Sequence, residues 1–204
     1  MIKNIIFDFG DIFIDLDKGA TLKKMSGFGL KGFTAGMEAV NHRYEKGLIT
    51  TPAYVDFYLK LYPNARRDEF IKAWNAIILK FPEHRLKWIE KLSEEKKYRL
   101  FLLSNTNALH IDKVIEQMGT ERYERFKNCF EKFYLSHEIN LRKPDTDIYS
   151  FVLNENKLVP EETCFIDDTK KNTDAALSLG IQCWNLIPGK EDITNLFNQP
   201  TFSL

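Results

Sequence analysis

Four short polar segments, far apart along the chain, carry side chains that suit chemistry at a phosphate group. They supply carboxylates, a hydroxyl, an amide and a lysine ammonium: Asp8, Ser104, Asn105, Lys143, Asp167 and Asp168. Mg²⁺ takes oxygen ligands and keeps several waters, so one or two carboxylates and substrate oxygens are enough to bind it. A carboxylate beside such an ion can attack phosphorus, and a lysine offsets the repulsion between the two anions. The residue types therefore indicate a site for a divalent cation and a phosphate.

Each of these residues, taken alone, also has a purely structural explanation. An aspartate that ends a strand, such as Asp8, is more often a helix cap or a turn residue than a nucleophile. Ser104 and Asn105 fit a polar turn, and Lys143 fits a solvated loop. The acidic pair at 167–168 fits the cap of a following helix. Whether these residues share a site depends on the elements that precede them.

The polar segments follow apolar runs that are typical of buried strands. Residues 2–7, 98–103 and 163–166 are short, continuously apolar runs, and each one stops at a polar segment. Such runs suit strands that are buried on both faces of a parallel sheet. Two further strands are predicted over 132–135 and 181–186. Ligands bind outside the carboxyl ends of the strands in such a sheet, so we expect the polar segments to converge on one rim.

Helical patterns separate the predicted strands. Apolar residues recur at helical spacing over 86–92, 111–118, 148–153 and 175–179. Strands that alternate with helices predict an α/β fold with a doubly wound, Rossmann-like parallel sheet core.

Residues 18–80 interrupt this alternation. Thr51 and Pro52 look like the cap and first residue of one helix, and Asp68 like the cap of the next. We therefore predict an all-helical insert over 18–80, and an α/β core formed by 1–17 and 81–204.

Composition limits the classes of protein to which the chain can belong. Its 204 residues suit one core domain with one inserted module. Lysine plus arginine and aspartate plus glutamate each number 29, so the formal net charge is zero. The absence of a basic excess argues against nucleic acid and anionic membranes as partners. Composition carries no prediction of oligomeric state.

Cysteine usage and hydropathy indicate a cytoplasmic protein. The three cysteines are Cys129, Cys164 and Cys183, an odd number without CxxC spacing, which argues against a disulfide framework and a zinc-thiolate site. We expect Cys164 and Cys183 to be buried structural thiols. No apolar stretch approaches the ~20 residues that span a bilayer, and the N-terminal residues lack the layout of a signal peptide.

The four polar segments resemble, in order, the four motifs of the haloacid dehalogenase-like (HAD) hydrolase superfamily. Residues 5–10 resemble the first motif, an apolar strand ending in Asp-x-Asp, with Gly10 in place of the second aspartate. Residues 102–105, 142–144 and 165–168 resemble the second, third and fourth motifs. The resemblance extends over nearly the whole chain.

The resemblance implies a catalytic role for four residues. Asp8 would attack phosphorus and form an aspartyl-phosphate. The Ser104 hydroxyl would hold the transferring phosphoryl oxygen, and Lys143 would neutralise charge on the nucleophile and the phosphate. Asn105 belongs to the second motif and is counted among the catalytic candidates.

The resemblance also implies Mg²⁺ as the cofactor. Asp8, the backbone carbonyl of Gly10 and Asp168 would be its ligands. Asp167 would bind the waters of the metal or take a ligand position itself, and it is counted among the catalytic candidates.

Within the superfamily, the chain resembles a subgroup of bacterial sugar-phosphate phosphatases that includes an α-D-glucose-1-phosphatase. The resemblance rests on residues 7–10, 15–17, 44–47, 104–107 and 141–145. That subgroup carries a small helical cap after the first strand, where residues 18–80 interrupt the alternation. The resemblance implies magnesium-dependent hydrolysis of a small phosphomonoester, a sugar phosphate, so the expected partner is a small phosphorylated metabolite.

Gly10 is a departure from the motif with a chemical consequence. Most phosphatases of the superfamily have a general acid and base at this position, although the resembling subgroup also has glycine. General acid–base help is worth ~10²–10⁴-fold, so another group would have to supply it. Asp11 could substitute as the acid or be only a turn residue. Glu45 could reach the substrate or be only a residue at a helix end that Gly47 terminates.

Two other functions stay open on these residues. The protein could be a catalytically weak phosphate-binding or regulatory protein that has lost its acid, for which Gly10 and Asp11 are the best support. It could also be a dehalogenase-type hydrolase, but such enzymes need no metal, and the intact pair Asp167 and Asp168 argues against this.

Overall fold

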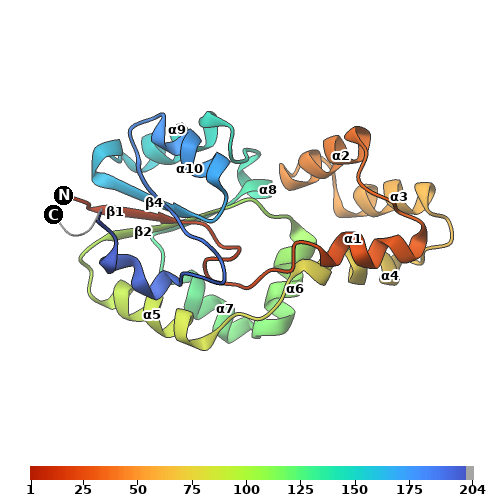
Figure 1. Cartoon of the computed structure of the whole chain (residues 1–204), viewed down its shortest axis with the longest axis horizontal. Coiled ribbons are helices and arrows are strands. Elements are labelled where there is room, and N and C mark those ends of the chain that lie inside the picture. Colours follow the sequence, from red (N-terminus) through yellow and green to blue (C-terminus); the bar gives the residue numbers. More distant parts are fainter. Residues whose placement is uncertain (201–204) are drawn as a thin grey trace.

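The computed structural model of the chain describes residues 1–200, and its strands form one parallel sheet (Figure 1). The order across the sheet is β3-β2-β1-β4-β5. The strands are β1 (Asn4–Phe7), β2 (Arg99–Ser104), β3 (Lys132–Leu135), β4 (Thr163–Asp167) and β5 (Gln182–Asn185). All five predicted strands are present, and the predicted α/β sheet core is confirmed.

The central strand is buried on both faces. Ile5 and Phe7 of β1 pack into one apolar cluster, whereas Ile6 packs into a second cluster on the other face. This explains why residues 5–7 of the strand are all apolar rather than alternating with polar residues. Cys164 in β4 is buried as predicted, whereas Cys183 in the edge strand β5 is only partly buried.

Helices cover both faces of the sheet. One face carries α5 (Glu83–Glu94), α6 (Ala108–Met118), α7 (Thr120–Lys127) and the 3₁₀ helix η4 (Ile193–Asn198). The other face carries α9 (Thr146–Asn156) and α10 (Lys170–Leu177). The short helices α8 (Ser136–Ile139) and η3 (Pro160–Glu162) lie in connections. Among residues 1–200, no helix is long and apolar enough to cross a membrane.

A group of helices, here called the helical module, lies beyond the carboxyl ends of the strands (Figure 1). It comprises α1 (Ala20–Met25), η1 (Ser26–Phe28), α2 (Ala35–Glu45), α3 (Thr51–Leu61), α4 (Arg67–Trp74) and η2 (Asn75–Ile77). Its helices pack around a separate apolar cluster that includes Tyr54, Tyr58 and Phe70. The module therefore has a core of its own.

Two helix starts in the module differ from the predicted ones. Thr50, not Thr51, caps α3, because the Thr50 side chain is placed to accept a hydrogen bond from the Ala53 backbone N–H. The predicted cap Asp68 lies inside the first turn of α4, where its carboxylate faces the positive end of the helix dipole. Both errors are of one or two residues.

Two chain segments that run side by side join the module to the core. Leu16 and Ile78 form an antiparallel bridge. Beside it, the Asp15 N–H donates to the Lys80 carbonyl at 3.0 Å, and the Asp17 N–H donates to the Ile77 carbonyl at 2.9 Å. These paired connections hold the module against the end of the sheet where the strands terminate.

A ring pair forms a further contact between the module and the core. Trp74 of α4 stacks on His110 of α6, with ring centroids 5.5 Å apart. Asn107, the N-cap of α6, accepts a hydrogen bond from the His110 backbone N–H at 3.1 Å. Burial lowers the pKa of His110 to about 4, so the folded protein keeps this ring neutral at pH 7.

We expect His110 to make the free energy of unfolding fall as the pH drops from 7 to 5. The unfolded chain protonates this histidine near pH ~6.5, whereas the folded protein does so only near pH 4. Protonation therefore favours the unfolded state in this window, by about 2 kcal/mol at pH 5. Urea unfolding at several pH values would measure this loss.

The control variants separate His110 from the other histidines. His110→Phe keeps a ring to stack on Trp74 but cannot titrate. Its free energy of unfolding should therefore fall less on acidification than that of wild type, by about 2 kcal/mol at pH 5. His42→Phe, at an exposed position of α2, should keep the wild-type pH dependence. If wild type and His110→Phe lose the same stability, the prediction is wrong.

Candidate active site

The carboxyl ends of three neighbouring strands bring the predicted site residues together. Asp8 follows β1, Ser104 ends β2 and Asp167 ends β4. Phe7 is in register with both Leu102 and Ile166, so these strand ends lie side by side. The predicted convergence of the polar segments on one rim is what the parallel register produces.

Lys143 lies at the centre of this rim. Its ammonium donates to Asp8 Oδ1 at 2.7 Å, to Asp167 Oδ2 at 2.7 Å and to the Leu103 carbonyl at 2.8 Å. These acceptors use its three N–H groups, and the side chain is only 1% exposed. The alternative of a solvated loop charge is therefore excluded for Lys143.

Asp8 and Lys143 each affect the other's pKa. Burial alone would lower the pKa of Lys143, but attraction by Asp167 and Asp8 outweighs it and raises the pKa. Burial and, to a smaller extent, the nearby Asp167 raise the pKa of Asp8 to about 7, although Lys143 opposes both effects. A divalent cation bound beside Asp8 would favour its anionic form further.

Asn105 holds the backbone that carries Lys143. Its Nδ2 donates to the Lys143 carbonyl at 2.8 Å, and its Oδ1 accepts from the Lys143 N–H at 2.9 Å. The side-chain amide therefore pairs with both backbone groups of one residue. This links the second and third polar segments and places Asn105 as a support of Lys143.

Asp167 is fully buried, and both of its oxygens accept hydrogen bonds. The Thr169 N–H donates to Oδ1 at 2.8 Å, Asn172 Nδ2 lies 3.0 Å from each oxygen, and Lys143 donates to Oδ2. A carboxylate offers about four lone-pair sites, and these contacts use them. The sequence predicts that Asp167 either binds the waters of the metal or is itself a metal ligand. This geometry disfavours the role of direct ligand.

A group of acidic side chains offers oxygen atoms to a cation. One ligand atom each from Asp8, Asp167 and Asp168 lies within 4.8 Å of the others. Oxygen donors of this kind suit Mg²⁺. Because the Asp167 oxygens already accept hydrogen bonds, Asp8 and Asp168 are the carboxylates left for the cation. Gly10 lies in the same cavity wall, and its carbonyl could add a third oxygen whatever its side chain. The residues present therefore fit the predicted cation.

These residues surround a cavity of about 480 Å³. Its wall includes Asp8, Gly10, Lys18, His42, Asn105, Arg142, Lys143, Asp168 and Lys171. Ser104, the last residue of β2, is buried and is not part of this wall. The cavity is large enough for a small phosphorylated metabolite.

Comparison with known proteins identifies the family. The family model described as haloacid dehalogenase-like hydrolase matches residues 5–186. The chain belongs to this family. The predicted superfamily and the predicted hydrolase class are thereby confirmed.

Solved and curated relatives of the HAD family resemble the chain along its whole length. A HAD family enzyme of Bacteroides thetaiotaomicron, solved as an aspartate-to-alanine variant with magnesium and inorganic phosphate, is 31% identical with a TM-score of 0.85, covering 98% of this chain and 100% of that one. The D-ribitol-5-phosphate phosphatase of that organism is 25% identical, over 97% of this chain and 100% of the relative. A predicted HAD-like hydrolase of Porphyromonas gingivalis shares the fold, with 24% identity and a TM-score of 0.81.

Gly10 departs from the HAD motif, and a leucine fills the space beside it. A Cβ atom added at Gly10 would lie 2.7 Å from Leu16 Cδ1, which is too close for real contacts. A larger side chain at this position would require Leu16 to move. Gly10 and Leu16 therefore fit together in this chain.

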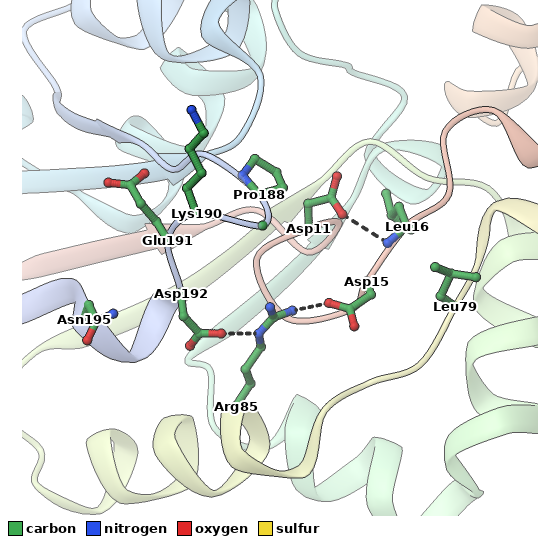
Figure 2. Close-up of a pocket in the computed structure, with 11 residues that line it drawn as sticks. Asp11, Asp15, Leu16, Leu79, Arg85, Pro188, Lys190, Glu191, Asp192 and Asn195 are labelled. Carbon is green, nitrogen blue, oxygen red and sulfur yellow. Dashed lines mark hydrogen bonds and ion pairs between the residues drawn. The ribbon is translucent and has the colours of Figure 1, made fainter.

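Asp11 has the geometry of a turn residue. Its φ is 56°, in the left-handed region that aspartate tolerates better than most residues. Its Oδ1 accepts from the Leu16 backbone N–H at 3.0 Å (Figure 2), and its Oδ2 lies 2.9 Å from the Lys18 ammonium. Both oxygens act as acceptors, so the structure favours the turn role over that of a substitute acid.

An arginine on the far side of this turn holds the connecting segment in place. Arg85 donates to Asp15 Oδ1 at 2.9 Å and to Asp192 Oδ2 at 3.0 Å, and these contacts line a second cavity of about 680 Å³ (Figure 2). The segment after Asp8 is therefore fixed on both sides of the turn.

Glu45 faces an arginine of the third motif rather than an open cavity. Its Oε2 lies 3.1 Å from Arg142 Nη2. The Ser136 hydroxyl donates to the Glu45 carbonyl at 2.7 Å. The end of α2 is therefore fastened to the core beside Lys143, and Glu45 is engaged with protein groups.

Two side chains near the site were not among its predicted residues. Asn172 supports Asp167, and Lys18 pairs with Asp11 and Asp168. Asn172 lies in the first turn of the helix after the fourth motif, which is a usable signal for a residue that faces the strand end. Lys18 has no such signal, because its contact with Asp168 joins distant parts of the chain.

We expect Asn105→Ala to reduce the free energy of unfolding by about 2 kcal/mol, because it leaves two partly buried backbone groups of Lys143 without partners. Urea unfolding at pH 7 would measure the change. Asn154→Ala, at an exposed position of α9, is the matched control and should leave stability nearly unchanged. Equal stability of Asn105→Ala and wild type would contradict the assigned support of Lys143.

Proposed function

We propose that the protein is a magnesium-dependent phosphatase that hydrolyses a small phosphomonoester, a sugar phosphate, through an aspartyl-phosphate on Asp8. The observation that carries the proposal is the buried Lys143 ammonium between Asp8 and Asp167. A lysine paired with two carboxylates at the wall of a cavity suits neutralisation of an incoming phosphate.

In this mechanism the protein supplies the nucleophile and the positive charge. Lys143 donates to Asp8 Oδ1, which leaves the other Asp8 oxygen for attack on phosphorus. The bond from phosphorus to the leaving oxygen breaks as the bond to Asp8 forms, and Lys143 neutralises the charge on the phosphoryl group. The sequence also assigns a phosphoryl oxygen to the Ser104 hydroxyl, but Ser104 does not line the cavity, so it would have to turn toward the substrate to reach it. Water then cleaves the aspartyl-phosphate, which releases phosphate and restores Asp8.

The metal site is part of the same proposal. Mg²⁺ held by Asp8, the Gly10 carbonyl and Asp168 would supply a Lewis acid that withdraws charge from the phosphoryl oxygens. Asp167 acts on the reaction through Lys143, because its oxygens accept hydrogen bonds from Lys143, Asn172 and Thr169.

The helical module is proposed to select the substrate as a cap. We infer that residues 18–80 form the cap and that 1–17 and 81–200 form the core; the last four residues of the predicted core range, 201–204, lie outside the residues that the structure describes. His42 of α2 and Arg142 of the core line the same cavity, so a substrate would contact both parts. The D-ribitol-5-phosphate phosphatase among the relatives supports a phosphorylated polyol or sugar as the substrate class.

One alternative has a specific observation in its favour. The position of the usual acid is Gly10, which has no side chain, and a larger residue there would require Leu16 to move. This favours a weak catalyst or a phosphate-binding protein if no other group protonates the leaving oxygen. An anomeric sugar phosphate has a better leaving group than a primary alcohol phosphate, which reduces the need for an acid.

Phosphate release from a panel of sugar phosphates and p-nitrophenyl phosphate tests the proposal. We expect turnover with Mg²⁺, none with chelator, and a loss of at least about a thousandfold in Asp8→Asn, because the amide is a poor nucleophile. Asp147→Asn, at an exposed position of α9, is the control and should keep wild-type turnover. If no ester is hydrolysed although Mg²⁺ raises the melting temperature, the result favours the alternative of a phosphate-binding or regulatory protein.

A second variant tests the proton donor. We expect Asp11→Asn to keep wild-type kcat at saturating Mg²⁺ for both sugar phosphates and p-nitrophenyl phosphate, since asparagine preserves the turn and its left-handed backbone. Loss of a general acid would instead cost ~10²–10⁴-fold, and more for the poorer leaving group. A selective loss on sugar phosphates would show that Asp11 is the acid.

A further inference from the structure

Lys18 makes contacts that the proposed chemistry does not use. It lies on the segment that joins β1 to the helical module, and its ammonium lies between two carboxylates. One is Asp11, whose Oδ2 is 2.9 Å away, and the other is Asp168, with which Lys18 forms a short ion pair through Oδ2. Asp168 is also one of the acidic side chains that fit the cation. Lys18 therefore pairs with an oxygen-bearing group that Mg²⁺ requires.

The three side chains differ in their freedom to move. The Lys18 side chain is 57% exposed, whereas Asp11 and Asp168 are 10% and 8% exposed. Asp11 is further held by the N–H of Leu16. The carboxylates are thus fixed parts of the wall, and the ammonium at the end of a flexible stem is the part that can leave.

Charge balance explains why a lysine is present here. Asp8, Asp167 and Asp168 lie close together, and Lys143 is already shared by Asp8 and Asp167. Asp168 and Asp11 would otherwise be two nearly buried anions without a cation. Lys18 supplies that cation in the absence of metal, and a bound divalent cation would make the same contribution at Asp168.

We propose that Lys18 is an internal counter-ion that competes with Mg²⁺ for Asp168, so that it determines how tightly the enzyme binds its metal. The inference rests on the proposed function in that it takes Asp168 as a metal ligand. When Mg²⁺ binds, Lys18 gives up Asp168 and stays paired with Asp11, which is outside the group of acidic residues that fit the cation. Lys18 is thus a residue that tunes metal affinity, and it takes no part in the transfer of the phosphoryl group.

Calorimetric titration of the full chain with Mg²⁺, without substrate, tests the inference. We expect Lys18→Gln to lower the Kd for Mg²⁺ about tenfold, because the metal no longer displaces an ion pair. Lys18→Arg keeps the charge and should bind Mg²⁺ as the wild type does.

Lys171→Gln is the matched control for the loss of one positive charge. Lys171 lines the same cavity, and within residues 1–200 it forms no ion pair. Its replacement should change the Kd by less than about twofold, as expected for screened charges that are not in contact. A tenfold effect in both glutamine variants would overturn the inference, because general electrostatics would then explain it.

Metal-dependent stability gives a second measurement that does not depend on turnover. Without Mg²⁺, Lys18→Gln should melt at a lower temperature than wild type, since Asp168 and Asp11 lose their cation. Added Mg²⁺ should then raise its melting temperature by more than it raises that of wild type.

The outcomes separate the inference from the proposed function. If wild type binds Mg²⁺ and Lys18→Gln binds it equally or more weakly, the competition is wrong, while the metal-dependent phosphatase stands. If neither binds Mg²⁺, both fail. If Mg²⁺ binds to Lys18→Gln but not to wild type, Lys18 competes so strongly for Asp168 that it prevents metal binding, which supports the inference.

Discussion

The buried ammonium of Lys143 is the interaction on which the rest of the site depends. A lysine that is 1% exposed is stable only if acceptors surround it, because an unpaired buried charge is very costly. Asp8, Asp167 and the Leu103 carbonyl provide those acceptors, and they come from three adjacent strands. The position of Lys143 therefore requires the parallel register of β1, β2 and β4. Asn105, which follows β2, holds the backbone of Lys143 in place.

The same electrostatic constraint extends outward through a chain of carboxylates. Each of the three aspartates of the site has a basic partner: Lys143 pairs with Asp8 and Asp167, which are buried, and Lys18 pairs with Asp168, which is partly buried. The chain has no net charge, so the site is a local arrangement of charges within a neutral molecule. An incoming dianionic phosphate and a divalent cation would together leave this local balance nearly unchanged. This favours binding both over binding either alone.

The helical module is coupled to the site by contacts on two sides of the cavity. Glu45 of α2 pairs with Arg142, the residue before Lys143. Lys18, which precedes α1, pairs with Asp168. A movement of the module would therefore change charges next to both Lys143 and the proposed metal site. In the proposed function, the element that would select the substrate would thus also affect the groups that act on it.

The amino-acid sequence by itself determined the sheet, the order of the polar segments and the family. These features depend on local patterns, because short apolar runs specify buried strands and parallel strands put their carboxyl ends on one rim. Helix starts were less accurate: Thr50 rather than Thr51 caps α3, since neighbouring threonines are equivalent in sequence and only backbone geometry distinguishes them. Only the tertiary structure decided the roles of Asp11, Glu45 and Lys18. Their partners are Leu16, Arg142 and Asp168. These contacts depend on where the loops lie in the folded protein and on the direction of each side chain, so the spacing of residues in the sequence does not predict them.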